Sequence, residues 1–207
     1  MLIDPPFARW VVSGDGCPVP GVQGASAAER FAAYEGVVRR RTNRMRRSAD
    51  GVNLPWPRAL GTPPWGLRRE LQTYGSLPGT RYEVDLLRHR STSQLARVHH
   101  RLTEVVREGE PAVLYVGNRH LPRHVTLIVP GQTRGTLDVY EPHAGTVIAL
   151  DPRSFAQRTL VLGGWRQPWL VIRPTGHRRA HADEPHRLHL PSFATDPRPE
   201  PAQRSAG

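Results

Sequence analysis

The sequence contains no lysine, because all 29 of its basic residues are arginine. Its formal net charge of +11 is of the kind that nucleic-acid-binding and membrane-surface proteins carry. A surface shaped only for phosphate would normally use both basic residues, however, and abundant alanine, glycine and proline beside arginine is typical of coding in a GC-rich genome. The charge alone therefore does not predict a nucleic-acid partner.

Cysteine is nearly absent as well, since Cys17 is the only one in 207 residues. A single cysteine excludes an intramolecular disulfide and a zinc site built on cysteines. No apolar run reaches the roughly 18 residues of a membrane-spanning helix. The segment Met1–Pro6 lacks the charged-then-apolar layout of a signal peptide. We therefore expect a cytoplasmic protein with no membrane partner.

Common phosphate-binding and zinc-peptidase motifs are also missing. The glycine clusters Gly14–Gly16 and Gly163–Gly164 have neither a following Lys-Ser/Thr pair nor a strand-to-helix setting. No His-Glu-x-x-His sequence occurs, and the adjacent His99 and His100 would point in different directions on a helix. We expect neither a metal nor an organic cofactor.

Helix signals dominate the first half of the chain. Ser26 with Glu29, and Ser91 with Gln94, form capping boxes, in which two side chains satisfy the free N–H groups of a helix start. The segment after Ser91 carries apolar residues at helical spacing and stops near Gly109. We predict another short helix, capped by Thr62 with a proline at its first position and ended by a glycine.

Strand signals dominate the second half. A continuous apolar run, typical of a central strand, covers residues 112–117. Alternating or apolar segments predict further strands at 82–86, 124–129, 137–141, 146–150 and 165–172. The turns between several of them are short, which favours antiparallel neighbours. The predicted fold class is α+β, with N-terminal helices packed on a mainly antiparallel sheet.

The composition changes again after Arg173. Residues 174–207 contain six prolines and few apolar side chains, too few to offset the entropy lost on ordering. We therefore predict one domain over residues 1–173 and a disordered tail over residues 174–207. Four histidines in the tail are too loosely spaced to predict a metal site: His177, His181, His186 and His189.

The strongest chemical signal is His124 near the start of one predicted strand and Glu141 at the end of the next. Residues 111–145 read PAVLYVGNRHLPRHVTLIVPGQTRGTLDVYEPHAG. This segment resembles the second half of papain-like cysteine peptidases of the C39 type. In that family a strand carries histidine in an H-x-V-x-L context, and the next strand ends in an acid followed by proline. The stretches GTPPWG at 61–66 and GGWRQPW at 163–169 resemble an actinobacterial branch of the family.

The resemblance implies a papain-like fold over residues 1–173, with His124 as general base and Glu141 as the acid that orients it. A cysteine peptidase needs a thiolate, a base and an orienting group. A carboxylate beside one imidazole nitrogen fixes the tautomer and stabilises the imidazolium. The family usually has aspartate where this chain has Glu141, so a different rotamer must make the bond. Asp138 is a weaker substitute, and Asn118 either contacts the site or holds a turn.

The nucleophile is the main departure from the family, whose reactive cysteine begins a long buried helix. Prolines and glycines follow Cys17 so closely that no persistent helix can start there. Met1–Ile3 instead resembles the last turn of a helix, because helices usually end before a residue that precedes proline. We expect the nucleophile helix to be encoded upstream of Met1, and this chain alone to be inactive toward peptide or protein substrates.

Two alternative functions remain open. Six of the nine residues from Arg39 to Arg47 are arginine, and a basic nucleic-acid-binding protein would use this run. Such a run is more often a solvated helix end. The other alternative is a non-catalytic, partner-binding scaffold that keeps the fold without the chemistry.

Overall fold

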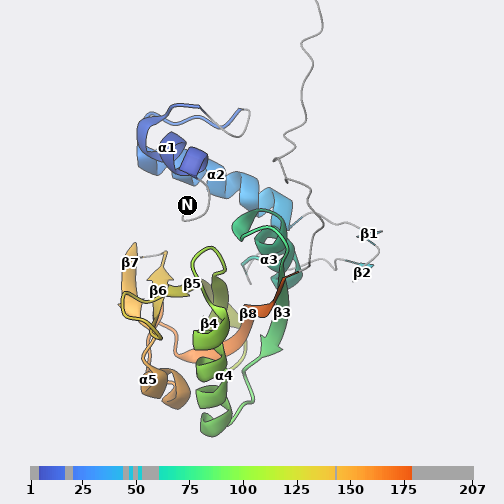
Figure 1. Cartoon of the computed structure of the whole chain (residues 1–207), viewed down its shortest axis with the longest axis vertical. Coiled ribbons are helices and arrows are strands. Elements are labelled where there is room, and N and C mark those ends of the chain that lie inside the picture. The colour runs from blue at the N-terminus through green and yellow to red at the C-terminus, as the bar shows by residue number, and fades with distance from the viewer. Residues whose placement is uncertain are drawn as a thin grey trace, which may run out of the picture.

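The computed structural model describes residues 5–16, 21–43, 47–48, 51–52, 61–142 and 144–178. Its centre is a six-stranded sheet in the order β3-β8-β4-β5-β6-β7, in which all neighbours are antiparallel (Figure 1). The strands are β3 (Thr80–Leu86), β4 (Ala112–Gly117), β5 (Pro122–Pro130), β6 (Leu137–Glu141), β7 (Thr146–Ala149) and β8 (Gln167–Arg178). The predicted α+β class is thereby confirmed, whereas the papain-like topology stays a prediction.

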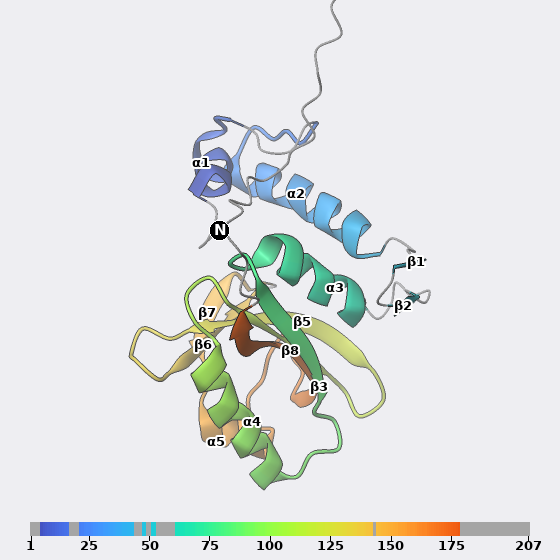
Figure 2. The ribbon, with the colours of Figure 1, turned by 45° about the vertical axis from the view of Figure 1, so that its right-hand side comes forward.

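Helix α3 (Pro64–Glu70) and the π-helical turn η2 (Leu71–Gly75) pack on one face of this sheet, and α4 (Thr92–Val105) and α5 (Pro152–Gln157) pack on the other. Helices α1 (Pro5–Ser13) and α2 (Ala27–Thr42) lie beyond α3, as Figure 2 shows. A two-stranded hairpin, β1 (Arg47–Ser48) and β2 (Gly51–Val52), lies between α2 and α3 in the chain. Within the described ranges, no helix combines the length and the apolar character needed to cross a membrane.

Two apolar cores hold the layers together, one on each face. The larger core packs α4 and α5 against the sheet, through side chains such as Leu102 and Phe155. The smaller core packs α3 and η2 against the other face, around the fully buried Tyr115. The alternation of side chains along each strand therefore decides which core a residue joins.

The predicted helix starts at Ser26 and Ser91 are present. Ser91 and Gln94 form the complete capping box at the start of α4. Ser26 accepts a hydrogen bond from the Glu29 backbone N–H, whereas the Glu29 carboxylate accepts from the N–H of Ala25. Local side-chain chemistry was sufficient to locate these helices, because each cap satisfies N–H groups that the helix itself leaves unpaired.

Two helices begin at prolines. Pro5 and Pro6 begin α1, because proline lacks only an N–H that a first turn leaves unbonded. The expected helical turn at Met1–Ile3 lies outside the described residues. Similarly, α3 begins at Pro64, one residue later than predicted, and the carbonyl of Thr62 accepts from the Tyr115 hydroxyl at 2.7 Å.

Strand β8 also differs, in both its length and its position. It continues past Arg173 to Arg178, where it pairs with Thr80, so the predicted start of the tail at residue 174 lies inside a strand. It lies between β3 and β4, although it is the last strand in the chain. The remainder of the predicted tail, residues 179–207, is outside the described part.

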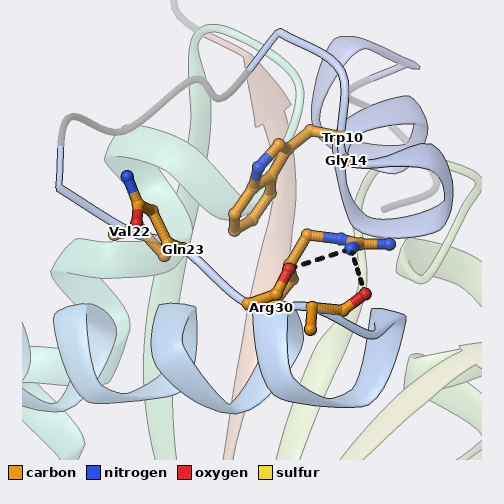
Figure 3. Close-up of a pocket in the computed structure, with 7 residues that line it drawn as sticks. Trp10, Gly14, Val22, Gln23 and Arg30 are labelled. Carbon is orange, nitrogen blue, oxygen red and sulfur yellow. Dashed lines mark hydrogen bonds between the residues drawn. The ribbon is translucent and has the colours of Figure 1, made fainter.

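Helices α1 and α2 are joined by the buried side chain of Arg30, shown beside Trp10 in Figure 3. Its guanidinium donates to the carbonyls of Val11 and Val12 at 2.9 Å, at the C-terminal end of α1. It also donates to the carbonyls of Gly24 at 3.0 Å and Ala25 at 3.3 Å, in the loop before α2. A positive charge at a helix C-terminus is favourable. Arg30 therefore links α2, on which it lies, to the end of α1 and to the loop before α2.

Candidate active site

His124 and Glu141 lie on neighbouring strands and face the same side of the sheet. His124 shares its face of β5 with Ile128, and Glu141 shares its face of β6 with Val139; both of these apolar residues belong to the core under α4 and α5. Ile128 and Val139 are register partners. Continuing the register places His124 one diagonal step from Glu141, a separation that long side chains bridge.

The two side chains are in direct contact. His124 Nε2 lies 2.7 Å from Glu141 Oε1, and the side chains are only 18% and 8% exposed. A carboxylate oxygen accepts hydrogen bonds, so Nε2 carries the shared hydrogen and Nδ1 is left to exchange a proton with another group. The predicted contact is thus confirmed, and its catalytic role stays a prediction.

A tight turn covers one side of the imidazole ring. The backbone φ angles of Gly163 and Gly164 are 55° and 84°, and Leu162 and Trp165 exchange two backbone hydrogen bonds of 2.8 and 2.9 Å across them. Positive φ at both central residues is the pattern of a type I′ turn. A Cβ atom on Gly163 would lie 2.7 Å from His124 Cδ2 and 2.9 Å from Nε2. The turn approaches the ring so closely that a side chain at this position would require the ring or the turn to shift.

Gly163 was missed as a site residue. The Gly163–Gly164 pair was rejected as a phosphate-binding loop, and otherwise entered only through the resemblance of residues 163–169 to the peptidase family. The available signal was a glycine pair between Leu162 and Trp165, which predicts a tight hairpin. Nothing local indicates that this hairpin packs on His124, since 39 residues separate the two, the difference between positions 163 and 124.

The weaker candidates are not part of the pair. Asp138 lies on the opposite face of β6 from Glu141. The Asn118 side chain accepts hydrogen bonds from the backbone N–H groups of His120 at 2.7 Å and Leu121 at 2.8 Å, so it holds the turn between β4 and β5. Cys17 lies outside the described residues, as does any thiol contact it makes.

The arginine run at the end of α2 is partly used inside the fold. Arg41 forms a 2.5 Å ion pair with Glu70 and its guanidinium lies 4.3 Å from the centre of the Tyr74 ring, so it joins α2 to α3 and η2. Burial raises the pKa of Glu70, although the charge of Arg41 opposes that rise. Arg39 and Arg40 are exposed. The nucleic-acid alternative therefore has fewer free arginines than the run suggested.

Comparison with other proteins adds no further identification. No protein-family model matches the chain, and no curated protein or solved structure matches it either. The resemblance to C39-type peptidases therefore stays a prediction carried by the sequence motifs.

Proposed function

We propose that His124 and Glu141 are the general base and the orienting acid of a papain-like cysteine peptidase of the C39 type, and that this chain alone does not hydrolyse peptides. The 2.7 Å contact between His124 Nε2 and Glu141 Oε1 carries the proposal. It couples a base to an acid on adjacent strands, in the order along the chain that the family uses. The turn at Gly163 adds support, because it restricts the ring from a third segment.

The chemistry follows from the two ring nitrogens. With Nε2–H donated to Glu141, the lone pair of Nδ1 accepts the proton of a thiol, and the resulting thiolate attacks a peptide carbonyl. The same nitrogen then returns the proton to the leaving amine. Glu141 keeps the ring in the tautomer that this exchange requires.

The orientation of the ring can be tested without any substrate. We expect nitrogen-15 NMR of the imidazole to show His124 as the Nε2–H tautomer at neutral pH. Glu141→Gln should weaken this preference, because a neutral amide can donate as well as accept. Glu108→Gln, at an exposed glutamate of the same chain, is the matched control. A tautomer that is the same in both variants would show that Glu141 does not orient the ring.

Activity is tested with a fluorogenic peptide library. We expect no cleavage by this chain. Where the reading frame continues upstream and encodes a cysteine, a chain that includes those residues should cleave the library. His124→Ala in the extended chain should slow cleavage by about 10²–10⁴-fold, the usual contribution of a general base. Cleavage by the present chain that persists in Cys17→Ala, or an extended chain indifferent to His124→Ala, would contradict the proposal.

A further inference from the structure

His124 and Glu141 lie at one end of the strands of the sheet, and this end also carries six arginines. Because the strands are antiparallel, β3, β4 and β6 end at this edge and β5, β7 and β8 begin there. We call it the arginine edge and define it as residues 86–91, 117–124, 141–142, 144–147 and 158–169. It contains Arg88, Arg90, Arg119, Arg123, Arg158 and Arg166, and its sole carboxylate is that of Glu141.

Contacts between the loops bring several of these arginines together. The Arg88 guanidinium donates to the Arg119 carbonyl at 2.5 Å and lies 4.3 Å from the centre of the Trp169 ring. Arg158 donates to the Arg90 carbonyl, also at 2.5 Å. These acceptors are neutral. In the described part of the chain, the arginine–carboxylate ion pairs involve Arg41 and Arg173 and none of the six edge arginines.

The general arginine content of the chain does not explain this imbalance. The opposite edge of the sheet, residues 76–81, 106–112, 130–138, 149–153 and 173–178, also contains six arginines. Four carboxylates accompany them there: Glu108, Glu110, Asp138 and Asp151. The two edges therefore differ in acidic residues, and the edge beside His124 carries the larger excess of positive formal charge.

The arginine edge also exposes apolar side chains. Of the seven large hydrophobic residues that the described chain exposes, four lie on this edge: Leu86, Leu121, Val147 and Val161. Scattered exposed apolar residues need no explanation, but this concentration among arginines is the composition of a protein-binding surface. It points to a partner that carries carboxylates together with apolar side chains.

A peptide fits this surface better than a nucleic acid does. Single-stranded nucleic acids bind where aromatic rings are free to stack on bases. Trp169 is partly buried and covered by Arg88, and among the described residues no tryptophan, tyrosine or phenylalanine on this edge is exposed. Strand β7 is an outer strand of the sheet, with only β6 beside it. It has no charged residue or proline that would prevent an extended peptide from pairing with its free side.

We propose that the arginine edge is the docking surface for the substrate of the proposed peptidase, and that the docked segment is acidic, with apolar residues among its carboxylates. That the docked segment is a substrate rests on the proposed function. Binding itself needs no thiol and no proton transfer, so it is measured on the present chain, and its outcome is independent of whether cleavage is found.

The test is fluorescence polarisation with the full chain and a labelled glutamate–leucine repeat peptide. We expect binding that weakens with added salt, weaker binding of a glutamate–serine repeat, and no binding of a lysine–leucine repeat. The triple variant Arg119→Gln, Arg123→Gln, Arg166→Gln removes three exposed charges of the edge. It should lower the affinity by about ten-fold, since exposed charge pairs contribute modestly each.

The matched control removes the same number of exposed charges from the opposite edge, as Arg81→Gln, Arg107→Gln, Arg134→Gln. It should change the affinity by less than about two-fold. Equal losses in the two triple variants would show attraction by net charge alone and would overturn the docking surface. Tighter binding of an oligothymidylate than of the acidic peptide, lost in the edge variant, would assign the surface to nucleic acid instead.

Discussion

Gly163→Ala should disturb the candidate site from a position that carries no functional group. The wild-type turn packs its backbone against the His124 ring, and the added Cβ would lie 2.7 to 3.0 Å from three ring atoms. Carbon atoms do not approach that closely, so either the ring or the turn must move. The ring is held by its bond to Glu141, and the turn is held by the two hydrogen bonds between Leu162 and Trp165.

The loss of free energy of unfolding expected for Gly163→Ala has two parts. Alanine in the left-handed region, at φ 55°, costs about 1 kcal/mol relative to glycine. Overpacking against the ring costs about 1–3 kcal/mol more, whether it is relieved by a shift of the turn or by loss of the bond to Glu141. We therefore expect the free energy of unfolding to fall by about 2–4 kcal/mol, the sum of the two ranges.

Urea unfolding measures this change, and the neighbouring glycine supplies the control. Gly164 has φ 84° but no atom within 4 Å of its missing Cβ, so Gly164→Ala should cost only the backbone part, about 1 kcal/mol. In a His124→Ala background the ring is gone, and Gly163→Ala should then also cost about 1 kcal/mol. The reasoning is refuted if Gly163→Ala costs no more than Gly164→Ala in the wild-type background.

Two further predictions concern the elements around the site. Arg30→Lys should lower the free energy of unfolding by about 2–4 kcal/mol, because an ammonium cannot reach all four carbonyls that the guanidinium binds. The control Arg39→Lys, on the exposed surface, should be nearly neutral. Equal denaturation midpoints for the two variants would contradict this role of Arg30. The hydrogen bond from the Ser154 backbone N–H lowers the pKa of Asp151, so its stabilisation is present above the ordinary aspartate pKa of 3.8 and is lost as the pH falls through the lower folded value. Unfolding curves at several pH values should show this acid-side loss in the wild type and not in Asp151→Asn, and parallel pH profiles would exclude it.

The parts of the fold that sequence predicts well are those whose physics is local. A capping box involves four consecutive residues, which is why the start of α4 at Ser91 was predictable. The strand at 112–117 was equally clear, because a fully buried strand needs an unbroken apolar run. Pro5 is less informative, because proline both follows helix ends and begins helices, and here it begins α1.

The position of β8 shows what local patterns cannot provide. Its apolar run predicted a strand, but its insertion between β3 and β4 depends on pairing with residues far away in the chain. The tail boundary failed for the same reason. Pro174 suggested loop on composition, yet it is buried in register with Tyr82, because the neighbouring strand supplies the contacts that composition does not record.

The candidate site depends both on local sequence patterns and on contacts between segments far apart in the chain. Sequence motifs placed His124 and Glu141 on adjacent strands, and the register that pairs Ile128 with Val139 puts both side chains on one face. The approach of Gly163 to the ring, and the arginines of the arginine edge, come from segments whose sequences carry no sign of their neighbours. The turn at Gly163 limits the movement of the ring on one side. In the proposed function the pair supplies the chemistry, and the proposed docking surface supplies selectivity for a substrate, because the six arginines of the arginine edge outnumber its single carboxylate.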